Sequence, residues 1–375
     1  MFRRPTPVAV PADEEHWTRL VSDLAAGFAA TVADDDATAR LPLDHLAALS
    51  ESGLDAAFLP QASGGQGLSY ATLGHVVRTL AHAHPAVATV WLMHVGAAHA
   101  LVTTSPPEQA AFFAAELRAG KRFSNALSEP AGGNHFLTSQ QDAEPADDGW
   151  TLTGRKLFVS GSEAADHLFL NARVDGEPGF FGVTVDDSVS FPPIEETMGM
   201  RATRSRTIVF DRTPLPADRR CGPPPADYAN LISVGFAFVS IGIAEAALDA
   251  AVTTATRSRG GARVADAGWA RQQTGLAWAE VTAAALLAER TAWLADTRSG
   301  EAMPAAMESK MLANEVAKKA AALALSLGGG GAYLVSSPIQ RIFRDAQAGA
   351  LMAYSVPFSA ELLGGWVFEG IPAAP

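Results

Sequence analysis

The sequence predicts a mainly α-helical protein with a β-rich middle, in the order N-terminal helical domain, antiparallel β-barrel, C-terminal helical bundle. Three observations support this fold class. Apolar residues recur every three or four positions in the first and last parts, and they alternate in the middle part. A run of one glycine and three prolines at 222–225 separates the last two parts. We place the domains at residues 1–122, 123–222 and 223–375 of the 375-residue chain.

The first part is predicted to be helical from about residue 12 to 120. Ala, Leu and Val recur at helical spacing over residues 44–50 and 73–82. The glycine-rich stretch 63–67 lies between these two segments and indicates a turn. The N-terminal domain should therefore consist of helices joined by short connections.

The middle part changes to a period of two, which is typical of strands whose side chains point alternately to the two faces of a sheet. Gly, Asp and Pro separate these segments at short intervals, as in a small antiparallel barrel. The alternating apolar residues are Leu168, Leu170, Ala172 and Val174, then Phe181, Val183 and Val185, then Ile208 and Phe210.

The last part returns to helical spacing and is rich in alanine, which favours close packing of long helices in a bundle. Gly328 follows the clearest helical segment, at the position of a helix C-cap glycine. The apolar residues on one face of that segment are Leu312, Val316, Ala320, Leu323 and Leu327.

The net charge of −12 argues against a nucleic-acid partner, because binding phosphates needs clustered Lys and Arg. The Arg-rich stretch 201–206 is either a solvated turn or a phosphate contact. The single cysteine, Cys221, cannot form an internal disulfide, and no Cys/His cluster has metal-ligand spacing, so we expect no metal.

A cytoplasmic location and no membrane partner are also expected. The N-terminal residues 1–5 lack the apolar core of a signal peptide. We find no uncharged apolar run of about 18 residues, the length that a membrane span needs, and interpret the apolar stretch 234–244 as part of a buried helix.

Five motifs occur in an order that resembles the acyl-CoA dehydrogenase superfamily, over about residues 41–364. The resemblance implies a C-terminal four-helix bundle, FAD bound between the barrel and the bundle, and a homo-oligomer, either dimer or tetramer. The motifs are Ser52-Gly53-Leu54 with Leu59-Pro60 and residues 64–67; Leu127-Ser128-Glu129-Pro130 with Gly132-Gly133-Asn134; Leu152-Thr153-Gly154-Arg155-Lys156 with Phe158-Val159-Ser160; residues 198–201 and 208–210; and Gly329-Gly330 with Pro338, Arg341, Arg344 and Asp345.

By this resemblance, one group of residues holds the flavin ring. The backbone near Leu127 and Ser128 would meet its pyrimidine edge, Phe158 would pack on the ring, and Ser160 would bond near its reactive nitrogen. Asn134 belongs to the same set of cofactor residues. The alternative for Phe158 and Ser160 is that they are ordinary residues of a barrel strand.

A second group would hold the adenine and pyrophosphate end of the cofactor. Arg257 or Arg259 is the candidate phosphate ligand, although the Phe of the family pattern "R..FG" is missing and Ser326 replaces the expected Gln. Gly329 and Gly330 would let the backbone approach the cofactor closely. The alternatives are a surface arginine and a pair of glycines that only end a helix.

The catalytic base of the family is missing. A base that removes an α proton is usually the Glu of "YEGT", and that position is Ala353 here. An alternative Glu position on an earlier helix falls near Ile232, and Ser355 matches the Thr of the motif. His94, on an apolar helix, is the remaining candidate base; the alternative is a core histidine whose hydrogen bonds are satisfied.

Three functions fit these residues. The first is α,β-dehydrogenation of an acyl thioester, carried by CoA or an acyl-carrier protein, with a displaced base and an electron-transfer partner. The second is a flavin-dependent monooxygenase that takes reduced flavin from a separate reductase and needs a dry pocket but no α-proton base. The third is a non-redox descendant that only binds a thioester or a protein. The sequence favours the first.

Overall fold

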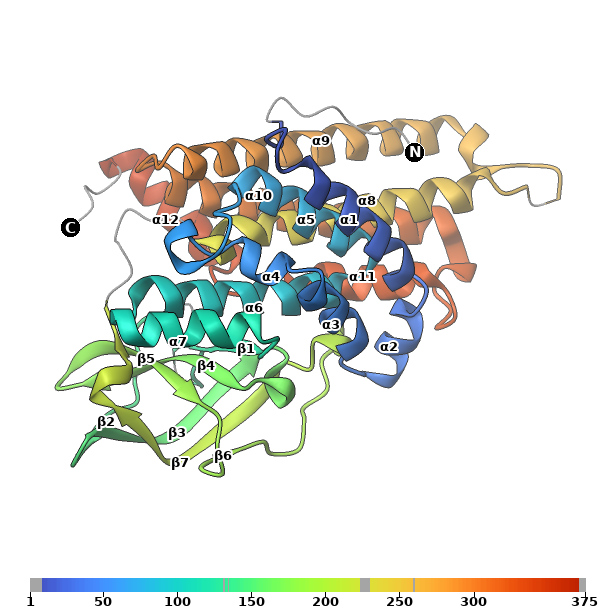
Figure 1. The fold of residues 1–375 in the computed structure, drawn as a ribbon. Helices are drawn as coiled ribbons and strands as arrows, with labels where there is room; N and C mark the ends of the chain where they lie inside the picture. Colours follow the sequence, from blue (N-terminus) through green and yellow to red (C-terminus); the bar gives the residue numbers. More distant parts are fainter. Residues whose placement is uncertain (1–8, 131, 134, 223–229, 259, 371–375) are drawn as a thin grey trace.

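The computed structural model describes residues 9–130, 132–133, 135–222, 230–258 and 260–370. The helices are stacked from α9 at the top down to α6 and α7, and the strands lie together below these last two, at the lower left (Figure 1). The predicted class, helices followed by a β-rich middle and further helices, is confirmed. Asn134, Arg259 and the three prolines after Gly222 lie outside the described residues.

Seven helices within residues 9–130 make up the N-terminal part, and they include both segments predicted from periodicity. Helix α5 begins after Ser69, whose hydroxyl accepts a hydrogen bond from the Thr72 amide, and α6 begins at Pro85, a residue suited to a first turn. The helices are α1 (Glu15–Phe28), α2 (Val32–Thr38), α3 (Leu43–Glu51), α4 (Leu54–Ala57), α5 (Tyr70–Ala83), α6 (Pro85–Thr104) and α7 (Pro107–Arg118).

The strands form two four-stranded sheets that share one apolar core. One sheet has the order β1-β4-β5-β8 and the other β2-β3-β7-β6. All pairs are antiparallel except β1 with β4, which are parallel. The strands are β1 (Phe123–Ala126), β2 (Ala143–Ala146), β3 (Gly149–Val159), β4 (His167–Val174), β5 (Glu177–Thr184), β6 (Val189–Ser190), β7 (Arg206–Pro216) and β8 (Arg220–Cys221).

Strand β4 is buried on both faces. Leu168 and Leu170 point into the core between the sheets, whereas Phe169 packs with residues of α6 and α7 on the other side. The helices approach closely, since a Cβ atom at Gly182 of the neighbouring strand would lie 2.4 Å from the ring of Phe113 in α7. The alternation in the sequence marked only one of the two buried faces.

The C-terminal part contains three long helices and two shorter ones. Helix α8 lies between α5 and α10, which explains why its first half is apolar on every side. A Cβ atom at Gly242 would lie 2.6 Å from the Arg78 carbonyl oxygen, so glycine lets α8 contact the backbone of α5. The helices are α8 (Leu231–Thr256), α9 (Gly268–Asp296), α10 (Ala302–Gly328), α11 (Pro338–Ala348) and α12 (Val356–Glu369).

The end of α10 differs from the prediction by one residue. Gly328 is still helical, and the C-cap is Gly329, which has a φ of +59°. A residue with a side chain would be strained at that φ, so the second glycine of the run, and not the first, is the one that ends the helix.

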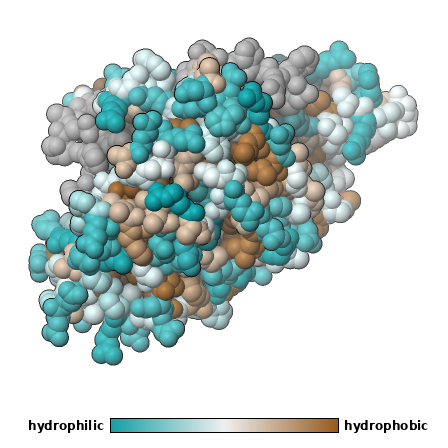
Figure 2. Space-filling model, in the orientation of Figure 1, coloured by the Kyte–Doolittle hydropathy of each residue, from teal (hydrophilic) through white to brown (hydrophobic). Residues whose placement is uncertain are grey.

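The expectation that no apolar segment has the length of a membrane span is wrong. Helices α6 and α8 are both long and apolar enough by composition, yet 83% of the most apolar window of each is buried inside the protein. Both are thus packed as core helices. On the face shown in Figure 2, polar residues dominate the lower left, over the β-rich part, and apolar residues gather in patches across the middle.

Candidate functional site

Phe158 is held in an unusual position at the end of β3. The pairing of β3 with β7 shifts register between Lys156 and Val159, and inside this bulge Phe158 has a φ of +54°. Its side chain is 69% exposed. A left-handed, exposed phenylalanine is strained and leaves its apolar surface in water, so the surrounding fold must enforce it. A flat ligand stacked on the ring would remove its apolar surface from water.

The segment after β1 runs beside this bulge. The Leu157 amide donates to the Ser128 carbonyl oxygen at 2.8 Å, and the Ser124 hydroxyl donates to the Ser160 carbonyl oxygen at 2.9 Å. Leu127 is half-buried against the core under α6 and α7. The structure therefore brings together four residues of the predicted flavin-ring group: Leu127, Ser128, Phe158 and Ser160.

Three hydroxyls form a chain next to Phe158. Ser160 Oγ lies 2.8 Å from Ser205 Oγ, which lies 2.8 Å from Thr203 Oγ1, and Thr203 donates to the Met200 carbonyl oxygen, also at 2.8 Å. The sequence analysis did not identify Ser205 or Thr203. Both residues lie between the two segments of the fourth motif, residues 198–201 and 208–210, so the motif pointed to this stretch without singling out either hydroxyl. These hydroxyls and the apolar ring of Phe158 fit an isoalloxazine, which is flat and edged with hydrogen-bonding atoms.

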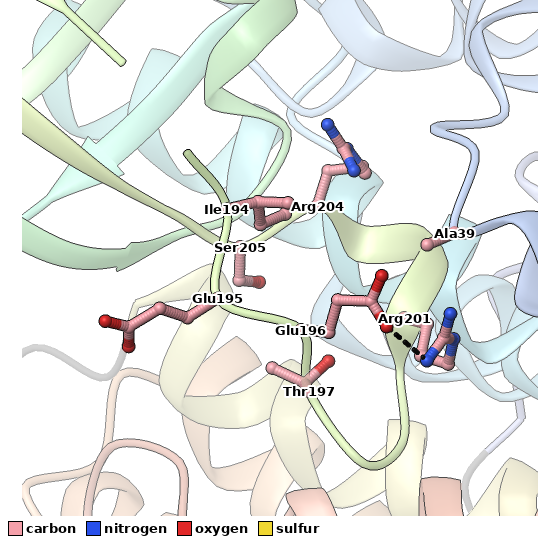
Figure 3. Close-up of a pocket in the computed structure, with 8 residues that line it drawn as sticks. All are labelled: Ala39, Ile194, Glu195, Glu196, Thr197, Arg201, Arg204 and Ser205. Carbon is pink, nitrogen blue, oxygen red and sulfur yellow. Dashed lines mark hydrogen bonds and ion pairs between the residues drawn. The ribbon is translucent and has the colours of Figure 1, made fainter. Parts of the chain in front are cut away.

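A shallow crevice is lined by Ser205 and by Arg201 and Arg204 of the Arg-rich stretch (Figure 3). Arg201 pairs there with Glu196 at 3.0 Å, and Arg204 forms three hydrogen bonds with Glu163. Arg206 also bonds Glu163, at 2.9 Å. All three guanidinium groups thus have carboxylate partners within the chain, which favours the structural interpretation of this stretch over a phosphate contact.

The turn between α11 and α12 carries Ala353, whose methyl group lies against the helical core. Tyr354 follows with a φ of +57°, and Ser355 is the N-cap residue of α12. Lys310 of α10 holds this turn in place, because its Nζ atom donates to the carbonyl oxygens of Gly349 at 2.9 Å and Tyr354 at 3.2 Å.

Lys310 is almost fully buried, and burial lowers its pKa to about 7. Asn314 also donates to the Gly349 carbonyl oxygen, at 2.8 Å, and accepts a hydrogen bond from Ser240. A small cavity between α8, α10 and α11 is lined by these three polar residues, by the carboxylate of Asp345, which accepts from the Met200 amide and Arg341, and by apolar side chains. The side chains bonded behind the Ala353 turn are therefore an ammonium group, an amide and a hydroxyl.

A loop from the β-rich part reaches across to the same turn. The ring of Phe136 lies 5.0 Å from that of Tyr354, and the ring of His135 lies 5.7 Å from that of Phe358 in α12. These four aromatic residues, which we call the aromatic wall, join the middle of the chain to the position of the missing base. Later in the chain than this loop, Phe158 lies on β3, and Ser160 is the residue directly after that strand.

Glu129 anchors this loop. Its carboxylate accepts hydrogen bonds from Lys156 at 2.5 Å, the Ser139 hydroxyl at 2.5 Å and the Gln140 amide at 2.7 Å. Lys156 is fully buried and also donates to Asn171. All these bonds are internal, so Glu129 shapes the loop and is not free to transfer protons.

His94 is not placed as a base. Its Nδ1 atom accepts from the Phe123 amide at 3.0 Å, and its Nε2 atom lies 3.0 Å from Asp55 Oδ2. The ring is 1% exposed, and burial lowers its pKa. Both ring nitrogens are occupied, so the alternative interpretation, a core histidine with satisfied hydrogen bonds, describes His94, and its candidacy as the base is corrected.

The second predicted cofactor group lies elsewhere in the chain. Arg257 is the exposed C-cap of α8, and Gly329 and Gly330 are exposed at the end of α10. The two ends are neighbours, since a Cβ atom at Gly328 would lie 3.7 Å from Thr254. Figure 1 draws the end of α8 at the right of the molecule and the strands at the lower left. One chain therefore does not bring the two groups together.

Comparisons with known proteins place the chain in a family. Models of the acyl-CoA dehydrogenase N-terminal, middle and C-terminal domains match residues 11–121, 124–213 and 233–353. L-evernosamine nitrososynthase of Micromonospora sp. is 30% identical over 92% of this chain and 89% of its own length. The probable acyl-CoA dehydrogenase fadE25 of Mycobacterium leprae is 26% identical over 84% and 85%.

A solved structure has the same fold. FMN-bound TdsC from Paenibacillus sp. A11-2, a dibenzothiophene monooxygenase, superposes with a TM-score of 0.85 at 22% identity, over 96% of this chain and 99% of its own. The family models, the similar relatives and a site that fits a flavin ring agree with one another. This chain belongs to the acyl-CoA dehydrogenase family and is a flavin-dependent oxidoreductase of that family.

Proposed function

We propose that this protein is a flavin-dependent monooxygenase that receives reduced flavin from a separate reductase. The observation that carries the proposal is the turn at Ala353, where the dehydrogenases of the family are expected to hold a carboxylate. Here a methyl group occupies the position, and Lys310 and Asn314 bond to the turn from behind. The carboxylate of Asp345, which lines the cavity behind the turn, is bonded to the Met200 amide and Arg341, so the turn position itself carries no α-proton base, which suits oxygen insertion better than dehydrogenation.

The names of relatives support the same direction. The relative that is 30% identical is named L-evernosamine nitrososynthase, and TdsC is named as a dibenzothiophene monooxygenase. We infer that the substrate of this chain is a small organic molecule, with an amine as the first class to test. It would lie against the aromatic wall, whose Phe136, Tyr354 and Phe358 exclude water from the reacting atoms.

The residues of the chain would have separate roles. Phe158 packs on the flavin ring, Ser160 forms a hydrogen bond to its edge, and Lys310 keeps the Ala353 turn in place. Bound reduced flavin supplies the electrons with which oxygen is activated. We propose FAD as the cofactor, because Arg257, Gly329 and Gly330 offer an exposed site for an adenine and pyrophosphate end. That site would serve the flavin of a second copy in a homo-oligomer.

α,β-Dehydrogenation of an acyl thioester, on CoA or a carrier protein, is the second candidate. The match of all three acyl-CoA dehydrogenase domain models favours it, and fadE25 is a relative of this class. The displaced base would then need a neutral form near pH 7. Lys310, whose pKa is about 7, is the group beside the turn with that property.

Two measurements on one preparation separate the candidates. The protein loaded with dithionite-reduced FAD is mixed with ¹⁸O₂ and a panel of amines, and mass spectrometry follows ¹⁸O in the products. The protein loaded with oxidised FAD is mixed anaerobically with acyl-CoA thioesters, and flavin absorbance is followed. Labelled product without bleaching supports the monooxygenase. Rapid bleaching with an enoyl product overturns it, and Lys310→Met would then test the displaced base.

A further inference from the structure

The chain of hydroxyls beside Phe158 has a preferred direction. Thr203 gives its only hydroxyl proton to the Met200 carbonyl oxygen, so toward Ser205 it can only accept. Ser205 has one proton and two hydroxyl neighbours, Thr203 at 2.8 Å and Ser160 at 2.8 Å. The direction in which Ser205 donates decides what Ser160 presents to a ligand.

Two arrangements are possible, and they are unequal. When Ser205 donates to Thr203 and Ser160 donates to Ser205, every hydroxyl proton has an acceptor and Ser160 presents a lone pair. When Ser205 donates to Ser160 instead, Thr203 receives no hydrogen bond from Ser205, and Ser160 must find an acceptor for its own proton. The first arrangement makes one more hydrogen bond inside the protein, which is worth about 1 kcal/mol.

This asymmetry bears on flavin chemistry. The reactive ring nitrogen of an oxidised flavin is a hydrogen-bond acceptor, and two-electron reduction turns it into an N–H donor. A Ser160 that presents a lone pair suits the N–H of the reduced form. Thr203 is buried, and its carbonyl oxygen accepts from the Gly161 amide at 2.9 Å, which holds the segment of Thr203 against that of Ser160.

We propose that Ser205 and Thr203 are positioning residues that orient the Ser160 hydroxyl as an acceptor, so that the site binds reduced flavin more tightly than oxidised flavin. No covalent bond changes, and each proton stays on its own oxygen. The inference rests on the proposed function and deepens it: a monooxygenase supplied by a separate reductase must capture reduced flavin and release the oxidised form.

The test uses the full chain, freed of flavin, and measures two dissociation constants. The apoprotein is titrated anaerobically with dithionite-reduced FAD and separately with oxidised FAD, and binding is followed by equilibrium dialysis. In the wild type we expect the reduced form to bind tighter. In Ser205→Ala the proton of Ser160 loses its acceptor when reduced flavin is bound, so the dissociation constant of reduced FAD should rise about tenfold and that of oxidised FAD much less.

The change in relative affinity should also appear as a shift in the reduction potential of bound FAD. A tenfold fall in the preference for the reduced form lowers the two-electron potential of bound FAD by about 30 mV, which dye equilibration resolves. Ser205→Thr keeps the hydroxyl and should retain the wild-type ratio. Ser188→Ala is the matched control, because Ser188 lies 2.9 Å from the Thr213 hydroxyl in the same part of the chain, away from Phe158.

Three results would overturn the inference. Equal weakening of both forms by Ser205→Ala would mean that the hydroxyl only holds the fold, and a wild type that prefers oxidised FAD would reverse the predicted direction. In the first case the wild type still captures reduced flavin, so the proposed function would stand; in the second case the chain would also fail what the proposed function requires of it. A wild-type chain that binds neither form would overturn the proposed function together with this inference.

Discussion

At the residue scale, Phe158 combines two unfavourable properties that a strand residue ordinarily avoids. Its positive φ costs about 1–3 kcal/mol, and its ring lies largely in water. The sequence motif identified Phe158 as a ring contact, but neither property was visible in it, because the bulge arises from the pairing of β3 with a strand some 50 residues away. An exposed ring in strained backbone is what a stacking ligand would stabilise.

Replacing Phe158 should change the stability of the fold and the affinity for flavin in opposite directions. Phe158→Gly removes the ring and relieves the positive φ, so the flavin-free protein should gain about 1 kcal/mol in free energy of unfolding, measured in urea. Flavin affinity should fall about tenfold, since the aromatic contact is lost. Arg212→Gly is the control: Arg212 is also exposed, with a φ of +50°, so it should gain stability without loss of affinity. Unchanged flavin binding in Phe158→Gly would contradict the stacking role.

His94 illustrates what a sequence cannot provide at this scale. A histidine on an apolar helix invites a functional interpretation, and the partners that decide the matter are far along the chain. Asp55 lies 39 positions before it and the Phe123 amide 29 positions after it. Periodicity places His94 on a helix and reveals neither partner.

At the element scale, buried charges fix how neighbouring segments pack. The pair of Lys156 on β3 and Glu129 holds the loop that carries half of the aromatic wall, and both side chains are buried. The pair connects residues that the motif search had assigned to two separate motifs. That the motifs share one ion pair could be learned only from the fold, because the segment after β1 runs beside β3, where the Leu157 amide donates to the Ser128 carbonyl oxygen.

Removing one member of this pair should destabilise the protein strongly. Lys156→Met leaves the Glu129 carboxylate buried without its cation, which costs about 3–5 kcal/mol. The double variant Lys156→Met/Glu129→Gln should recover a large part of that loss in urea unfolding. Lys121→Met, which breaks an exposed pair with Asp166, should change stability by less than about 1 kcal/mol. If Lys156→Met alone is at least as stable in urea as the double variant, the buried-charge argument is wrong.

Helices α5, α8 and α9 meet at a second group of charges. Arg78 forms two hydrogen bonds with Glu245, at 2.6 and 2.8 Å, and a longer one of 3.4 Å with Glu289. The other carboxylate oxygen of Glu289 has no partner among the described residues. Burial, together with the charge of Glu245, raises the pKa of Glu289 to about 7.

Stability should therefore depend on pH through Glu289. Its pKa is higher in the folded state than its ordinary value of 4.5, so the folded state binds the proton more tightly, and stability is lost as pH rises from about 5 through 7. Glu289→Gln should flatten this dependence and be more stable at pH 8 by about 1–3 kcal/mol. Denaturation at pH 5 and pH 8 measures it, with exposed Glu280→Gln as the control. An unchanged pH slope would show that Glu289 is ionised at little cost.

At the scale of the whole molecule, the order of helical and β-rich parts followed from periodicity, whereas their mutual arrangement did not. Asp36 and Arg344 form a salt bridge across 308 positions and tie α2 to α11. No local pattern predicts such a contact. The motifs predicted the family because each depends on a local turn or strand, and the family supplied the arrangement.

The surface of α9 leads to a prediction about assembly. Trp269, Leu276, Leu286 and Trp293 are each 43–55% exposed along this one helix, which is more apolar surface than an isolated helix face ordinarily shows. We expect a dimer or tetramer in which a second copy covers them. Leu276→Glu should lower the mass measured by light scattering after gel filtration, and Gln272→Glu should not. A wild type that is monomeric at micromolar concentration would contradict the expectation.

The double burial of β4 has a consequence for how the chain is made. An excised piece covering residues 123–222 would present Phe169 and Phe180 to water, because α6 and α7 cover them in the intact protein. Those two helices come earlier in the sequence and so leave the ribosome before β4 does. In the nascent chain, α6 and α7 are thus already made when β4 emerges and can cover it. In a circular permutant that begins at β1, β4 would be made before these two helices, and its apolar face would stay exposed until they followed.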